Sequence, residues 1–325
     1  MYMLVSSYIL FKIGFGFFSS TNRFDNARGF GHFIRLLDLL QPFILSFTTL
    51  MLMNRKSLIS KIIFVFFILI FVFYSAFING AKISVIFSIL TIVFTICLFY
   101  NPKKFRVNVF TIILLFFIGF VFATAALKMN LIMNNENIDK KSELINGIPI
   151  VLEKLILRIV ANGNTSYLLL PNDIIEKIET DSVISRFLSS IIGISLSSKI
   201  MGYDTSSYSV GRQANLYYDP KVEIAGGPTS HLDLFAYVYF GPFFGCFFII
   251  ITAFTLGHIY SAIINYRKKN FLSIAFLSTL WVRSVIVIVE PTIGYAYIID
   301  VFIFFTILYI LVNLLMISKK VIYYE

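Results

Sequence analysis

The sequence predicts an all-α polytopic membrane protein with about eight transmembrane helices and one large loop of about a hundred residues outside the membrane. Of the 325 residues, 58% are hydrophobic and only 14% are charged, with a mean hydropathy of +0.86. This composition leaves too little polar surface for a soluble globular protein. Eight apolar stretches approach the length of about 20 residues that a spanning helix needs. No stretch alternates with the period of a barrel strand, so the spans are predicted to be helices.

The predicted spans divide into two groups around the large loop. They cover residues 1–18, 33–53, 59–78, 83–100, 107–127, 234–260, 271–289 and 296–317. The first span is the weakest of the eight, because it is short and contains Lys12. We therefore expect one integrated domain, made of a five-span bundle (1–127), a large extramembrane loop (128–233) and a three-span bundle (234–325).

Basic residues predict how these helices are oriented. Eleven Lys and Arg residues gather in three turns and the C-terminal tail, where Glu325 is the only acidic residue. They are Arg55, Lys56, Lys61, Lys103, Lys104, Arg106, Arg267, Lys268, Lys269, Lys319 and Lys320. The positive-inside rule makes these segments cytoplasmic. Strict alternation then places both termini in the cytoplasm and residues 128–233 outside. The basicity is thus a topology signal and not a surface for nucleic acid.

The two cysteines, Cys97 and Cys246, both fall within apolar stretches, so they do not indicate a disulfide framework. The sequence contains no Asp-x-Asp motif and no cluster of His and Cys residues. Nothing in it therefore requires a metal ion, and no cofactor is expected.

The large outer loop is nearly balanced in charge, with ten basic and eleven acidic residues between positions 128 and 230. Apolar residues at helical spacing predict an amphipathic helix at the membrane surface over Leu144–Val160, and a second over Val183–Ile200. The segment Gly202–Arg212 is rich in Gly, Ser and Tyr. Such residues suit sugar hydroxyls and ring faces, and they equally suit an ordinary exposed loop.

Three arginines near the N-terminus, Arg23, Arg28 and Arg35, lie on the predicted outer side and oppose the positive-inside rule. The planar guanidinium group matches phosphate oxygens, which makes a lipid pyrophosphate one natural ligand. The alternative is internal pairing, because Asp25 with Arg28 and Arg35 with Asp38 have the (i, i+3) spacing of helix neighbours.

Two further cations lie on the outer half of the predicted bundle. Lys82 falls in a tight turn between two spans, where it could bind phosphate or extend its amine to the interface as a helix-end lysine. Arg283 lies inside the seventh span, where a charge is costly and often functional. A structural ion pair with Glu290 or Asp300 is the favoured interpretation of Arg283.

The segment Gly226–Gly245 joins the large loop to a long apolar helix. Ser230 and Asp233 fit a capping pattern, which makes Asp233 a helix cap and not a catalytic acid. His231 would then occupy the first helical position, where a neutral imidazole can act as a general base and the helix N-terminus favours anions. Further on, Pro242 predicts a bend in the helix.

The run Pro228–Phe235, followed by Phe240–Gly245, resembles the histidine segment and downstream Gly-x-x-x-Gly pattern of the O-antigen polymerase (Wzy) and O-antigen ligase superfamily. Arg23–Gly31 is similar to the arginine-containing outer loop of that superfamily, and Asn79–Lys82 falls where many members have a small-residue turn ending in arginine. The resemblance covers nearly the whole chain as topology and about forty residues as motif. Two departures are the lysine at position 82 and the eight spans, where relatives usually have ten or more.

The resemblance implies a metal-independent glycosyltransferase at the periplasmic face of the bacterial inner membrane. Such an enzyme moves an undecaprenyl-pyrophosphate-linked glycan en bloc onto a hydroxyl of a lipid-linked repeat unit during lipopolysaccharide biosynthesis. The resemblance implies that His231 is the base. It also implies three partners: the lipid-linked oligosaccharide, a chain-length regulator and a flippase of the same pathway. The candidate ligands of the leaving pyrophosphate are Arg23, Arg28 and Arg212, and Lys82 and Arg283 are the second choices.

Two other functions stay open from the sequence. The first is an O-antigen ligase of the same superfamily, whose acceptor is the lipopolysaccharide core, and the motifs do not separate it from a polymerase. The second is a transporter, such as a flippase for lipid-linked oligosaccharides. Transporters often show inverted repeats with discontinuous helices, and no such repeat is evident here.

Overall fold

The computed structural model describes residues 1–13, 29–79, 83–100, 147–160, 164–221, 227–266 and 270–322, with short pieces between 117 and 132. Within these residues the secondary structure is helical and contains no β-strand. Five helical segments are long and apolar enough to cross a membrane. They are α3 (Gly31–Asn54), α4 (Leu58–Asn79), α12 (Leu232–Asn265), α13 (Phe271–Ser284) with its continuation η4 (Val285–Ile288), and α14 (Pro291–Ile322). The chain is an all-α membrane protein, as its sequence predicts.

The five long helices coincide with five of the eight predicted spans. Two more predictions correspond to shorter helices, α1 (Tyr2–Ile13) and α5 (Ile83–Tyr100). The predicted span 107–127 falls mostly outside the described residues. The count of eight spans therefore stays a prediction.

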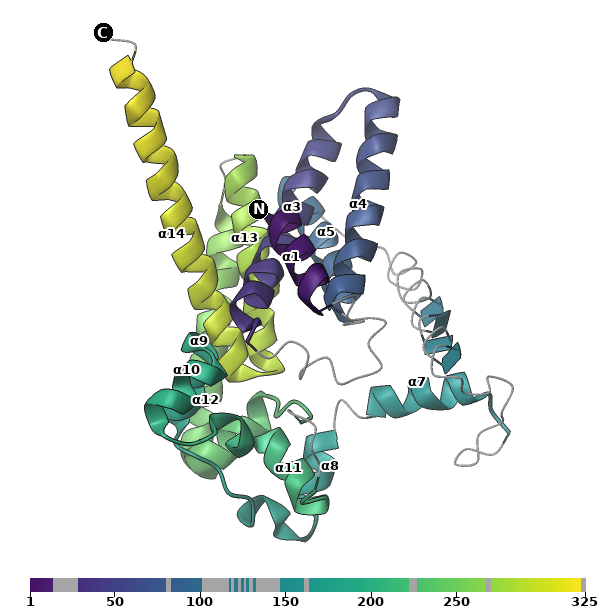
Figure 1. Cartoon of the computed structure of the whole chain (residues 1–325), viewed down its shortest axis with the longest axis vertical. Coiled ribbons are helices and arrows are strands. Elements are labelled where there is room, and N and C mark those ends of the chain that lie inside the picture. Colours follow the sequence, from purple (N-terminus) through teal and green to yellow (C-terminus); the bar gives the residue numbers. More distant parts are fainter. Residues whose placement is uncertain are drawn as a thin grey trace.

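Helix α3 is the centre of the bundle. It packs against α1, α4, α5 and α13, and its side chains Leu37, Leu45 and Leu50 are fully buried. In Figure 1 these helices, α1, α3, α4, α5 and α13, lie together in the upper half of the molecule. Burial at this point arises because α3 offers apolar side chains around much of its circumference, which suits a helix surrounded by others.

A buried group of polar side chains, which we call the polar seam, connects α3 to α4 and α5. The Gln41 side-chain nitrogen lies within hydrogen-bonding distance of the hydroxyl groups of Ser75 of α4 and of Ser84 and Ser88 of α5, at 3.0, 3.0 and 2.9 Å, and its two hydrogens are shared among them. Water does not reach the hydrocarbon core, so polar groups there must find partners within the protein. Bonds of this kind hold spanning helices in a defined register, each contributing about 0.6 kcal/mol on average.

Helix α12 is broken in its N-terminal third. Gly241 has φ 72° and ψ 179°, and Pro242 follows it. This backbone conformation is essentially restricted to glycine. The break brings the two halves close together, since a Cβ on Gly245 would lie 2.8 Å from the carbonyl oxygen of Ala236. The bend predicted from Pro242 is confirmed.

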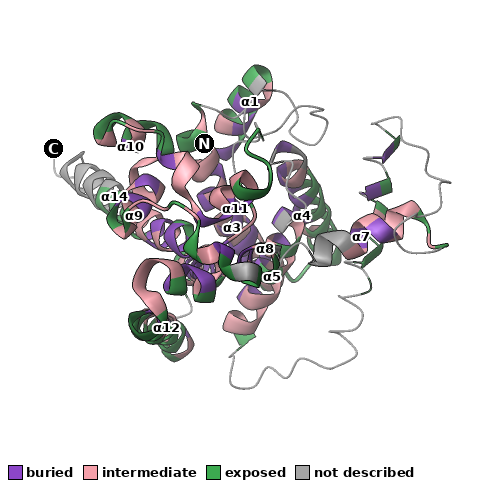
Figure 2. Ribbon diagram, turned by 90° about the horizontal axis from the view of Figure 1, so that it is seen from below, coloured by how far each residue is buried: buried purple, intermediate pink, exposed green. Residues whose placement is uncertain are grey.

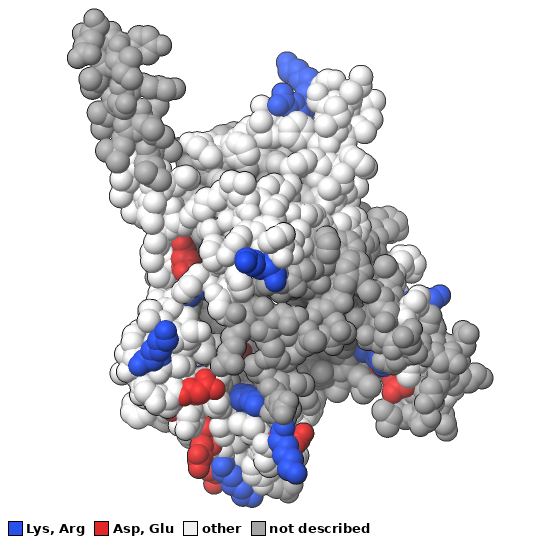
Figure 3. All heavy atoms as spheres, viewed as in Figure 1, with Lys and Arg blue, Asp and Glu red and all other residues white. Residues whose placement is uncertain are grey.

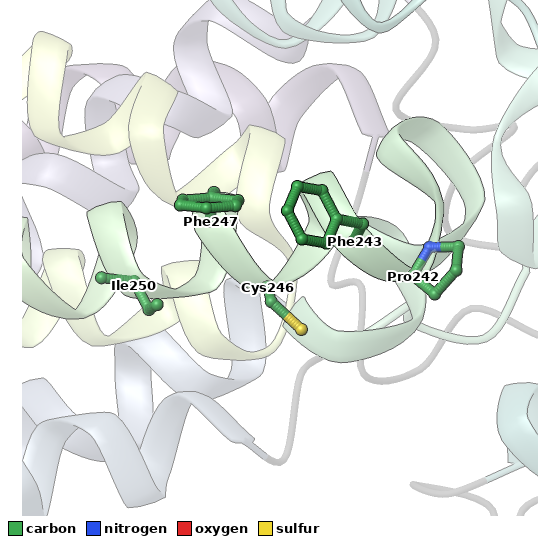
Figure 4. Close-up of a pocket in the computed structure, with 5 residues that line it drawn as sticks. All are labelled: Pro242, Phe243, Cys246, Phe247 and Ile250. Carbon is green, nitrogen blue, oxygen red and sulfur yellow. The ribbon is translucent and has the colours of Figure 1, made fainter.

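Beyond the break, α12 presents an apolar surface. A depression of about 560 Å³ lies along one face of the helix (Figure 4) and is lined by Pro242, Phe243, Cys246, Phe247 and Ile250. Figure 2 shows α12 set apart from the buried centre of the bundle, with exposed residues over much of its surface. An exposed face this apolar fits the lipid environment of a membrane protein.

Short helices between α5 and α12 gather at one end of the long helices (Figure 1). They are α7 (Ile150–Val160), α8 (Asn164–Leu169), η2 (Pro171–Glu176), α9 (Val183–Ile192), α10 (Ile194–Met201), η3 (Thr205–Tyr208) and α11 (Val210–Tyr218). We refer to the part from α8 to α11 as the cap. A small apolar core joins it to the start of α12, formed by Leu169, Ile174, Val210, Ala214 and Leu234.

The two amphipathic helices predicted in this region are present with changed bounds. Helix α7 covers the second half of Leu144–Val160. The predicted helix Val183–Ile200 is divided into α9 and α10 at Gly193, whose φ of 93° ends the first helix. A glycine adopts such a positive φ without the steric cost that other residues bear.

Charged side chains are segregated on the face seen in Figure 3. Basic groups appear at the tip of the α3–α4 hairpin, where Arg55 and Lys56 lie in the sequence, and groups of both signs gather around the cap. A largely uncharged belt lies between them. Such a belt is the surface that a bilayer core requires.

Candidate functional site

His231 lies where the cap joins the bundle. Helix α12 begins at Leu232, and His231 is its N-cap residue, with φ 55° and ψ 160°. A positive φ is uncommon for a residue other than glycine and costs about 1–3 kcal/mol, so it persists only where the surrounding structure enforces it. The imidazole is partly exposed, and its Nε2 atom lies 3.4 Å from the Thr229 hydroxyl.

The capping arrangement expected at this helix start is wrong. His231 precedes the helix and does not occupy its first position, and the N-cap makes no side-chain hydrogen bond to the helix. Asp233 lies exposed in the first turn. Ser230 does not cap α12 because its backbone N–H and hydroxyl are both directed to the carboxylate of Glu290, at 3.2 and 3.5 Å.

Two connections therefore join the His231 segment to the link between η4 and α14. The backbone N–H of His231 donates to the carbonyl oxygen of Val289 at 3.0 Å. Glu290, the next residue, accepts both hydrogen bonds from Ser230. Together these contacts hold the backbone immediately before the strained residue and at its own N–H. From the sequence, Glu290 is a candidate partner for Arg283 only, and nothing in its local pattern indicates the contact with Ser230.

Burial raises the pKa of the Glu290 carboxyl, while the hydrogen bonds from Ser230 and the charges of His231 and Arg186 act in the opposite direction. Arg186 of α9 is itself buried and paired with Asp181, with an Nη2–Oδ2 distance of 2.6 Å. It also donates to the carbonyl oxygen of Thr205. The Arg186–Asp181 pair therefore belongs to the interior of the cap, next to the histidine junction.

A close backbone approach positions the segment that leads to His231. A Cβ on Gly227 would collide with the backbone of Gly211, and a Cβ on Gly211 would collide with the carbonyl group of Pro228. Both positions require glycine because no side-chain movement can relieve a clash between backbone atoms. Arg212 is the next residue of α11, so the structure places it in the helix against which this segment packs.

Arg35 is engaged inside the protein. Its guanidinium group binds both carboxylate oxygens of Asp300 at 2.7 Å, and its Nη1 donates to the carbonyl oxygens of Ser190 and Ile191, also at 2.7 Å. These two carbonyl groups lie in the last turn of α9, where helices leave acceptors unpaired. Internal pairing was the alternative to phosphate binding for Arg35, and the guanidinium is paired internally, but with α14 and α9 and not with Asp38.

Arg283 is also held by contacts inside the protein. It is buried and lies 3.8 Å from the carboxylate of Asp38, with its guanidinium carbon 4.8 Å from the ring centre of Tyr297. The Tyr297 hydroxyl donates to the other Asp38 oxygen at 3.2 Å. An ion pair at Arg283 was predicted, but the partner is Asp38 and neither Glu290 nor Asp300. Helix α3 supplies this partner because it packs directly on α13.

The remaining predicted phosphate ligands, Arg23, Arg28 and Lys82, lie outside the described residues. Of the predicted site residues that the structure describes, His231 and Arg212 lie on segments in contact, whereas Arg283 lies within the bundle. Within the described part of the chain no three His, Cys, Asp or Glu side chains group together in a way that could hold a metal ion.

Comparisons with known protein families, with curated proteins and with solved structures found no match to this chain.

Proposed function

We propose that this protein is a polymerase of surface polysaccharide repeat units that acts on polyprenyl-pyrophosphate-linked glycans. The observation that carries the proposal is a partly exposed histidine, held in a strained conformation at the start of an apolar helix. Strained residues concentrate at functional sites. A histidine in this position can reach a substrate whose lipid lies in the membrane and whose sugars lie outside it.

The reaction needs a base for the acceptor hydroxyl and cations for the leaving pyrophosphate. His231 accepts the proton of the acceptor hydroxyl while the hydroxyl oxygen bonds to the anomeric carbon of the donor glycan. The bond from that carbon to the pyrophosphate oxygen breaks, and its electron pair leaves with the polyprenyl pyrophosphate. Arg212, on the helix that contacts the His231 segment, is the described residue best placed to stabilise this anion.

We assign the other phosphate contacts to Arg23, Arg28 and Lys82. Arg283 is no longer among the proposed phosphate ligands. Arg283 is buried beside Asp38 and Tyr297, so it serves the bundle. In this proposal the chain crosses the inner membrane of a bacterium eight times, with both termini in the cytoplasm. The cap is then periplasmic, as part of the loop 128–233.

Deletion of the gene in its native host tests the proposal. We expect the ladder of surface polysaccharide to collapse to the core bearing a single repeat unit, and His231→Ala to reproduce this phenotype at a normal protein level. His258→Ala is the matched control, because His258 lies in the far half of α12, beside Phe254. We expect it to leave the ladder intact.

The same experiment separates the alternatives. Loss of every repeat unit would instead indicate an O-antigen ligase or a flippase. The break in α12 at Gly241 is the observation that favours a transporter, because discontinuous helices often line transport sites. A normal ladder in the His231→Ala strain would overturn the assignment of the base, and a normal ladder after gene deletion would overturn the proposed function.

A further inference from the structure

The segment Thr229–His231 is held from one side by the start of α14. Glu290 precedes Pro291, the first residue of α14, and its backbone is part of the turn that follows η4, with its N–H bonded to the carbonyl oxygen of Ile286 at 2.8 Å. A Cβ on Gly294 would collide with the backbone of Val287, so this turn and the first turn of α14 are in close contact. The backbone that carries Glu290 is therefore closely packed.

The carboxylate of Glu290 extends from this turn to Ser230, the residue before His231. It accepts the Ser230 backbone N–H at 3.2 Å and the Ser230 hydroxyl at 3.5 Å. The adjacent main-chain bond from His231 to Val289 runs in the same direction. Each connection restrains the backbone of one residue, and together they oppose relaxation of the positive φ at His231.

Glu290 also stands in electrostatic contact with His231. The other charged or titratable groups that face it are Arg186 of α9 and Tyr239 of α12. Arg186 is already paired with Asp181. A positive charge that develops on the imidazole would therefore form near a carboxylate whose other cationic neighbour has its own partner. In hydrolytic triads the third group orients the general base by a hydrogen bond to the imidazole, whereas Glu290 acts through its hydrogen bonds to Ser230 and through its charge.

We infer that Glu290 is the positioning residue of His231, which fixes the backbone conformation of the histidine through Ser230 and stabilises the imidazolium formed when the histidine takes a proton. The inference rests on the proposed function for its catalytic meaning, and on the hydrogen bonds above for its structural meaning. In the transfer step the proton of the acceptor hydroxyl passes to the imidazole, the new glycosidic bond forms, and the pyrophosphate departs with the bonding electrons. Glu290 itself neither gains nor loses a proton.

A graded series of variants in the purified full-length protein tests this role by kinetics. Glu290→Gln preserves a hydrogen-bond acceptor for Ser230 but removes the charge, Glu290→Ala removes both, and Ser230→Ala removes only the hydroxyl contact. A displacement of about 1 Å at a reacting group can cost about 100-fold in rate. We therefore expect Glu290→Ala to lower kcat about tenfold or more with KM nearly unchanged, Glu290→Gln to recover part of that loss, and Ser230→Ala to remain close to the native rate.

A second measurement does not depend on catalysis. The chain has three histidines, so His32→Gln with His258→Gln leaves His231 as the single target for carbethoxylation, provided that purification uses a tag without histidine. The probe is diethyl pyrocarbonate at constant pH, and the modified peptide is counted by mass spectrometry. We expect Glu290→Ala to change the labelling rate of His231 several-fold, and Glu290→Gln to change it less, because Gln keeps the acceptor for Ser230 but not the charge.

An unchanged labelling rate and an unchanged kcat in Glu290→Ala would overturn the inference. A loss of activity that Glu290→Gln does not rescue, accompanied by less folded protein in gel filtration, would also overturn it, because Glu290 would then be needed only for folding. If the parent protein transfers no glycan but Glu290→Ala still changes the labelling of His231, the positioning role stands and the proposed function fails.

Discussion

Arg35 joins three helices that are distant in the sequence, and its removal should destabilise the fold more than any surface change. Its bidentate bond to Asp300 connects α3 to α14, and its two bonds to Ser190 and Ile191 connect α3 to the end of α9. In Arg35→Met the Asp300 carboxylate loses its cation and two helix carbonyl groups lose their donor. We expect this variant to lose stability through both effects.

The magnitude follows from the exposure of the two partners. Breaking a buried ion pair costs about 3–5 kcal/mol, but the side chains of Arg35 and Asp300 remain 21% and 25% exposed, so the lower end applies. Each carbonyl group left without a donor adds about 1 kcal/mol. We expect a loss of about 5 kcal/mol in Arg35→Met. In Arg35→Met/Asp300→Leu the stranded charge is gone, and the loss should shrink to about 2 kcal/mol, the cost of the two carbonyl groups.

The native tryptophan provides the assay. Trp281 is the single tryptophan of the chain, and its ring lies against Phe94 and Tyr260, with centroid distances of 5.8 and 5.0 Å. Its fluorescence during unfolding by sodium dodecyl sulfate in mixed micelles reports on the bundle. Arg55→Met is the matched control at the C-terminal end of the same helix, because Arg55 is an exposed C-cap residue whose guanidinium carbon lies 5.3 Å from the ring centre of Phe64. We expect it to cost less than about 1 kcal/mol. Equal stability of Arg35→Met and Arg55→Met would refute the reasoning.

Four further predictions use single positions. Gly241→Ala should cost about 1–3 kcal/mol, because its φ of 72° and ψ of 179° suit only glycine; a neutral result by the same fluorescence assay would contradict the break in α12. Gly227→Ala should lower the yield of folded protein in gel filtration, since its Cβ would meet the backbone of Gly211, whereas Gly257→Ala, with open space around it, should not. Gln41→Leu leaves three serine hydroxyl groups without their amide donor and should cost about 1–2 kcal/mol; an increase in stability would count against the polar seam. Burial raises the pKa of Glu290, so the folded state holds this proton more tightly than the unfolded chain, and the associated stability is present at low pH and lost as the pH rises through the raised pKa. Glu290→Gln should therefore unfold at a higher temperature than the native protein at neutral pH but not well below pH 4.5, the ordinary value; a difference that grows on acidification would have the wrong sign.

The sequence predicts those features of the fold that depend on local composition. Long apolar stretches are sufficient to identify α3, α4, α12, α13 and α14, because burial in lipid demands a continuous apolar surface over about 20 residues. The bend at Pro242 is likewise predicted from a single residue, whereas the division of the predicted helix Val183–Ile200 into α9 and α10 is not, although it also arises at one residue. Proline lacks a donor, and Gly193 accepts a positive φ of 93°.

Partners in the bundle depend on packing and cannot be predicted from spacing along the chain. Arg35 is three residues from Asp38, yet its guanidinium bonds to Asp300, which is 265 positions away. The same applies at the candidate site, where the local pattern favours Ser230 as a cap for α12. A carboxylate 60 positions further on competes for that serine. Helix packing brings these groups together, and only the three-dimensional structure reveals it.

The central claim is that His231 is the base of a glycosyl transfer on a lipid-linked substrate. The most direct measurement uses the purified protein in liposomes with a chemically defined polyprenyl-pyrophosphate-linked repeat unit, and follows both the elongated glycan and the released polyprenyl pyrophosphate. The account predicts elongation by the native protein and by His258→Ala, and a loss of about 100-fold or more in His231→Ala, the contribution of a positioned general base. Elongation at the native rate by His231→Ala would contradict it.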